Sequence, residues 1–125
     1  MLSITKRFDF CYGHQLPDHE GKCKNVHGHN AVLEVTVTGL LHTDGPSNGM
    51  IVDFGILKDI VDRHVVDKLD HQFLNDYLVT SAPPTAEQLV LRITGELIEP
   101  FLERDLHLVR VRLYETPDSY AEWTA

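Results

Sequence analysis

The stretch His27-Gly-His-Asn-Ala-Val-Leu-Glu-Val-Thr-Val-Thr38 alternates in the character of its side chains. The odd positions hold two histidines followed by apolar residues: His27, His29, Ala31, Leu33, Val35 and Val37. The even positions are mostly polar. Because alternate residues of a β-strand point to the same face, this run predicts a half-buried strand. Two neighbouring imidazoles lie at one end of its apolar face.

A second strand is predicted over residues 4–14, where the even positions are apolar apart from Lys6 and end in His14. Three imidazoles, from His14, His27 and His29, can therefore converge on one ion. Three histidines and an open fourth position are typical of catalytic zinc, although imidazole also suits iron and nickel. The alternative is chance, because the chain contains 8 histidines in 125 residues.

The rest of the chain predicts two helices and three further strands. One helix begins after the N-cap Asp53, with residues including Phe54 on its apolar side. The other opens with the capping box Thr85–Gln88 and ends or kinks near Pro100. The strands are expected at residues 50–52, 108–115 and 119–124. The order β-β-β-α-α-β-β indicates one α+β domain spanning residues 1–125, with an antiparallel sheet and helices on one face.

Composition narrows the class of function. The net charge of −8 argues against generic nucleic-acid binding. The longest apolar runs are too short to span a membrane. Two cysteines without a secretory signal indicate a reducing cytosol, so we expect a cytoplasmic protein.

The two cysteines are expected to differ in role. Cys23 stands between Lys22 and Lys24, and nearby cations or a metal favour its thiolate. The alternative is that Cys23 is an unreactive loop thiol. Cys11 lies on the opposite parity from His14, so we expect a small core residue.

Five further residues suggest acid–base or binding roles. Asp70 can orient the imidazole of His71, although a structural role at a helix end is the default. Glu115 ends the apolar face of its strand, so it either binds ring N–H donors or simply reaches water. Thr85 and Glu87 are explained equally well by helix capping.

These pieces occur together as Cys23-x-x-x-His27-Gly-His29 after His14, then Leu69-Asp70-His71, Pro84-Thr85-x-Glu87 and Tyr114-Glu115-Thr116. From about Phe8 to Thr116 the chain resembles the 6-pyruvoyltetrahydropterin synthase / 6-carboxytetrahydropterin synthase family. The resemblance implies the tunnelling fold, a four-stranded antiparallel sheet with two helices packed on one face. It also implies a homohexamer of two trimers, with pterin sites between subunits.

The resemblance also implies a role for each motif residue. His14, His27 and His29 would hold zinc, Cys23 would be the general base, and Asp70 with His71 the second acid/base group. Glu115 would anchor the pterin ring, helped by Thr85 and Glu87. Two departures stand out: Phe10-Cys11-Tyr12-Gly13 replaces smaller residues of relatives, and Ala86 replaces a second threonine.

The implied reaction is that of a zinc-dependent carbon-carbon lyase in queuosine and 7-deazapurine biosynthesis. It converts 7,8-dihydroneopterin triphosphate to 6-carboxy-5,6,7,8-tetrahydropterin, acetaldehyde and triphosphate. The compact spacing between Cys23 and His27 favours this carboxy branch. The alternatives are a 6-pyruvoyltetrahydropterin synthase, which eliminates triphosphate without cleaving the side chain, and a noncatalytic metal- or pterin-binding module. The cations that bind the triphosphate stay unassigned.

Overall fold

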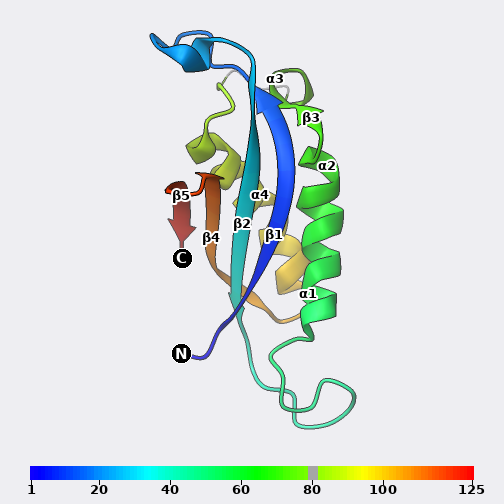
Figure 1. Cartoon of the computed structure of the whole chain (residues 1–125). Coiled ribbons are helices and arrows are strands. Elements are labelled where there is room, and N and C mark those ends of the chain that lie inside the picture. The colour runs from blue at the N-terminus through cyan, green and yellow to red at the C-terminus, as the bar shows by residue number, and fades with distance from the viewer. Residues whose placement is uncertain (79–81) are drawn as a thin grey trace.

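A computed structural model describes residues 1–78 and 82–125 (Figure 1). Its strands are β1 (Ile4–His14), β2 (His27–Thr38), β3 (Gln72–Phe73), β4 (His107–Thr116) and β5 (Ser119–Thr124). Its helical segments are η1 (Lys22–Lys24), α1 (Phe54–Val61), η2 (Asp62–Val66), α2 (Asp67–Leu69), α3 (Leu74–Tyr77) and α4 (Ala86–Leu102). The α+β class is confirmed. Among the described residues, no helix is long and apolar enough to cross a membrane.

The strands form one sheet in the order β3-β1-β2-β4-β5. The prediction of four antiparallel strands was therefore incomplete, because β3 adds a fifth strand and pairs parallel to β1. A strand of two residues is too short to produce an alternating pattern.

The expected strand at residues 50–52 was wrong. Ile51 and Val52 are buried, but the segment is irregular and leads directly into α1. The amide of His42 donates to the Met50 carbonyl, and the amide of Gly49 donates to the His42 carbonyl. These bonds close a loop in which Gly49 has a φ of +81°, a conformation that glycine adopts at little cost.

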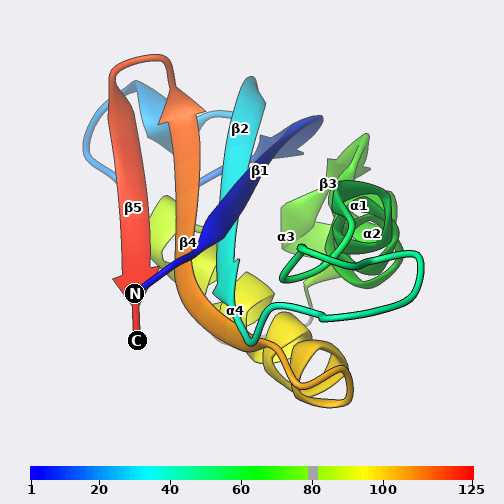
Figure 2. The same ribbon diagram turned by 90° about the horizontal axis from the view of Figure 1, so that it is seen from below.

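The core lies between one sheet face and the layer of α1, η2, α2, α3 and α4, which lies on that side of the sheet (Figure 2). The side chain of Asp53 caps α1 by accepting a hydrogen bond from Gly55, and Thr85 caps α4 by accepting one from Gln88. The expectation that Phe54 is buried was wrong. It stands in the first turn of α1, where its side chain is 53% exposed.

A β-bulge changes the parity of β4. Thr36 pairs with Arg110, but Val37 pairs with Leu108, so Val109 is an extra residue between the two pairs. Leu108 is consequently buried, whereas Val109 is only half-buried. Strict alternation along the strand expected at residues 108–115 would put Val109 on the apolar face that ends in Glu115, and the bulge makes that expectation wrong.

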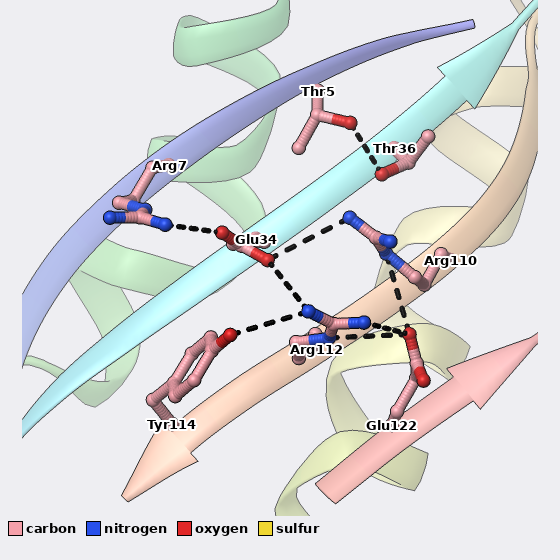
Figure 3. Close-up of polar contacts among 8 residues, drawn as sticks. All are labelled: Thr5, Arg7, Glu34, Thr36, Arg110, Arg112, Tyr114 and Glu122. Atoms are coloured by element: carbon pink, nitrogen blue, oxygen red, sulfur yellow. Dashed lines mark hydrogen bonds and ion pairs between the residues drawn. The ribbon is translucent and has the colours of Figure 1, made fainter. Parts of the chain in front are cut away.

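The opposite sheet face carries a network of charged and polar side chains (Figure 3). The carboxylate of Glu34 lies 2.6 Å from Arg7 and 3.7 Å from both Arg110 and Arg112. Glu122 on β5 lies 3.0 Å from Arg112. The network extends across four strands and leaves this face polar.

Cys11 lies on this polar face and is exposed, so its expected place in the core was wrong. Its thiol donates to Asn30 Oδ1 at 3.1 Å. The parity argument correctly put Cys11 opposite His14. The expected burial of Cys11 was wrong because the layer of α1, α2 and α4 packs on the other face of the sheet (Figure 2).

The packing of α4 against the sheet gives a direct test of the fold. Leu97 is fully buried, whereas Leu102 on the same helix is 51% exposed. We expect Leu97→Ala to lower the free energy of unfolding by about 2–5 kcal/mol, because it leaves a cavity in the core. Leu102→Ala is the matched control and should change it far less. Equal losses for both variants in denaturant titrations would contradict this packing.

Candidate metal centre and active site

The three histidines meet at the paired ends of β1 and β2. His14 pairs with His27 across the two strands, and Tyr12 pairs with His29. The Nε2 atom of His14 lies 2.8 Å from that of His27 and 3.0 Å from that of His29. These three residues form a group whose potential ligand atoms all lie within 4.8 Å of one another.

Backbone carbonyls orient two of these rings. His14 Nδ1 donates to the Pro84 carbonyl at 2.8 Å, and His27 Nδ1 donates to the Asn25 carbonyl at 2.8 Å. A carbonyl only accepts hydrogen bonds, so the proton of each ring lies on Nδ1 and the Nε2 atoms carry lone pairs. Two lone pairs face each other at this distance, an arrangement that a shared cation would stabilise.

Burial favours the neutral form of two of these histidines, which is the form that binds a metal. His14 is 1% exposed. Removal from water lowers the pKa of His14 and of His29, and so favours the neutral imidazole. Three neutral nitrogen donors with one open side suit zinc. The residues present therefore fit a zinc ion, and the same donor set also suits iron or nickel.

Cys23 lies in η1, on the segment that joins the two histidine-bearing strands. The Cys23 carbonyl accepts a hydrogen bond from the Leu16 amide at 2.8 Å, which closes the base of this loop. The thiol is half-buried and does not belong to the three-histidine group. The role of Cys23 as a general base therefore stays a prediction.

Asp70 and His71 follow α2, as expected, and are held against β1. Asp70 Oδ1 accepts hydrogen bonds from the Cys11 amide and from His71 Nδ1, each at 2.9 Å, and these bonds lower the pKa of Asp70. The His71 amide donates to the Cys11 carbonyl at 2.7 Å, and its backbone adopts a φ of +60°. His71 lines one groove of about 510 Å³ together with His27 and His29.

Glu115 lies beside the three histidines, closer than the sequence suggested. Its Oε1 is 3.5 Å from His14 Nε2 and 3.4 Å from His29 Nε2. The β4–β5 register shifts between Tyr114 and Thr116, so Glu115 stands at an irregularity of the sheet. Irregularities of this kind often direct a side chain into a site.

A cavity of about 580 Å³ opens next to Glu115, a size that suits a small heterocyclic ligand. Residues of α4 and β5, including Ala86, Glu87 and Trp123, line it. Thr85 does not line this cavity, and its hydroxyl instead caps α4. The structure thus brings Glu87 and Glu115 together and gives Thr85 a structural role.

Sequence reasoning missed three groups at this site. The Pro84 carbonyl, distant in sequence from His14, and the Asn25 carbonyl, two residues before His27, orient these imidazoles. Neither backbone contact leaves a sequence pattern. The third is Tyr12, whose hydroxyl donates to Glu115 Oε1 at 3.1 Å. Its even position on β1 was a usable signal, because it places Tyr12 on the same face as His14.

Residues 3–125 match the family model described as 6-pyruvoyl tetrahydropterin synthase. A Haemophilus influenzae protein named 6-carboxy-5,6,7,8-tetrahydropterin synthase is 34% identical over 98% of this chain and 99% of its own length. The protein of that name from Synechocystis is 42% identical over 89% of this chain and 85% of its own length.

The solved structure of Caenorhabditis elegans 6-pyruvoyl tetrahydropterin synthase shares the fold. It matches with a TM-score of 0.83 and covers 99% of this chain and 95% of that chain, at 24% identity. The expected tunnelling fold is thereby confirmed. Because the family model matches nearly the whole sequence, the chain belongs to the 6-pyruvoyl tetrahydropterin synthase family.

Proposed function

We propose that this protein is a zinc-dependent lyase that forms 6-carboxy-5,6,7,8-tetrahydropterin from 7,8-dihydroneopterin triphosphate, with release of acetaldehyde and triphosphate. The observation that carries the proposal is the convergence of three imidazoles beside Glu115, which also lines a cavity of ring size. Relatives that match over nearly the whole chain bear the name of this enzyme. The product belongs to the route to queuosine and other 7-deazapurines in the cytoplasm.

Zinc would be held by His14, His27 and His29, and when bound it would acidify a side-chain hydroxyl of the substrate. The Pro84 and Asn25 carbonyls keep two of the ligand rings in the required tautomer. No carboxylate or thiolate belongs to the three-histidine group among the described residues. The open side is therefore available to substrate.

The proton transfers are assigned to two groups. Cys23, flanked by two lysines in a loop beside the ligand strands, acts as the general base. His71 acts as the second acid or base. Asp70 holds one ring nitrogen of His71, and the exposed position of His71 leaves its other nitrogen free to meet the substrate.

The ring of the substrate is assigned to the cavity beside Glu115. The carboxylate accepts hydrogen bonds from the N–H groups of the aminopyrimidine edge, and the exposed Glu87 lines the same cavity. The contribution of Thr85 is to cap α4, which fixes the helix end that carries Glu87. Ala86 provides only an apolar wall at this place.

Two features support an assembly of several copies. The outer edge of β5 is unpaired among the described residues, and β3 covers only Tyr12 and Gly13 of the β1 edge. Open edges on both sides of a sheet invite pairing between subunits. We propose a homohexamer of two trimers, in which neighbouring sheets join and the pterin site lies between subunits.

Product analysis separates the proposed reaction from its alternatives. Purified zinc-loaded protein given 7,8-dihydroneopterin triphosphate should release acetaldehyde and triphosphate and yield a 6-carboxylated pterin. A 6-pyruvoyl product without acetaldehyde would assign the chain to the pyruvoyl branch. Binding of the pterin without any turnover would instead indicate a noncatalytic module.

Metal analysis tests the ligand assignment. The wild type should bind about one zinc ion per chain, whereas His27→Ala should lose both the metal and the activity. His42→Ala is the control, because His42 is an exposed loop residue whose ordered hydrogen bonds come from its backbone. A His27→Ala variant with full zinc content would refute the assignment.

Substitution of Cys23, with Cys11 as the matched control, tests the assignment of the general base. Cys23→Ala should keep its zinc but lose turnover by about 10²-fold or more, because proton abstraction loses its base. Cys11→Ala should change turnover much less, because Cys11 holds Asp70 and His71 through its backbone, which the substitution keeps, while its thiol bonds Asn30. Loss of zinc from Cys23→Ala, measured by mass spectrometry of metals, would make Cys23 a ligand instead of a base.

A further inference from the structure

Tyr12 is a buried polar residue that the proposed chemistry leaves unused. Tyr12 is only 3% exposed. Its ring packs edge-on with His14 and in a tilted arrangement with His29, at centroid distances of 5.2 and 5.6 Å. A buried phenol requires a hydrogen-bond partner. That partner is Glu115 Oε1, at 3.1 Å from the Tyr12 hydroxyl.

This contact gives the two oxygens of the Glu115 carboxylate different surroundings. Oε1 accepts from Tyr12 and lies against the Nε2 atoms of His14 and His29. Oε2 has no hydrogen-bond partner within residues 1–78 and 82–125. The side chain is 27% exposed and borders the cavity, so the carboxylate can still accept from a ligand.

Resting on the function proposed above, we propose that Tyr12 is a positioning residue for ring recognition. Its hydroxyl holds Glu115 Oε1 and thereby presents Oε2 to the N–H donors of the pterin ring. A carboxylate at the end of a glutamate side chain otherwise samples several rotamers, and fixing one of them reduces the entropy lost on binding. The role differs from that of a metal ligand, because Tyr12 acts through Glu115.

The position of Tyr12 in the sheet supports this role. Tyr12 pairs with His29 on β2 and with Gln72 on β3, so its backbone is fixed on both sides. Its ring belongs to the core and lies beside the rings of Phe10, His14 and His29. A donor on so rigid a support can hold the carboxylate in one place.

A double-mutant cycle between Tyr12→Phe and Glu115→Gln tests the proposal. The readout is the calorimetric affinity of the zinc-loaded protein for 7,8-dihydroneopterin, which lacks the triphosphate. In the wild-type background, Tyr12→Phe should weaken binding by about tenfold. In the Glu115→Gln background, it should weaken binding by less than about twofold, because the carboxylate on which it acts is absent.

The zinc content and the midpoint of thermal unfolding are measured for each variant together with its affinity. Both should stay near the wild-type values in Tyr12→Phe, since the ring and its packing are kept. Tyr77→Phe, which removes a hydroxyl from an exposed residue of α3, is the control and should leave the affinity unchanged.

Two results would overturn the proposal. An unchanged affinity in Tyr12→Phe would show that the hydroxyl does not position Glu115. Equal losses in both backgrounds would show that Tyr12 acts by some other route. Failure of the wild type to bind 7,8-dihydroneopterin would be a different result, because it would remove the proposed function and this inference with it.

Discussion

The register between β1 and β2 is the constraint on which the rest of the structure depends. It pairs His14 with His27 and Tyr12 with His29, so that three imidazoles and a phenol gather on one face. The same register buries the apolar residues of both strands under the helices. A shift by one residue would turn every side chain of one strand to the opposite face, so the core and the metal centre are specified together.

Elements distant in sequence then complete the centre. The residue before the cap of α4 supplies the carbonyl that orients His14, so the start of that helix and the metal site are tied directly. An irregularity of the β4–β5 pairing brings Glu115 alongside. The sheet face that would hold the metal therefore also supports the carboxylate that would hold the pterin.

Much of this arrangement could be predicted from alternation alone. The strands that carry His14, His27 and His29 were recognisable because their period-two patterns are long, and the caps Asp53 and Thr85 marked both helix starts. The two-residue β3 and the bulge at Val109 were not recognisable, because such short features leave no pattern. The exposure of Cys11 depends on which face the helices cover, and strand parity does not contain that information.

The central claim is that three histidine nitrogens hold zinc while Cys23 stays outside the coordination sphere. X-ray absorption spectroscopy of the zinc-loaded wild type tests it most directly, because sulfur and nitrogen neighbours differ in distance. We expect only nitrogen and oxygen neighbours of the zinc, at about 2.0–2.2 Å. A sulfur neighbour at about 2.3 Å would contradict it, because Cys23 would then be a ligand.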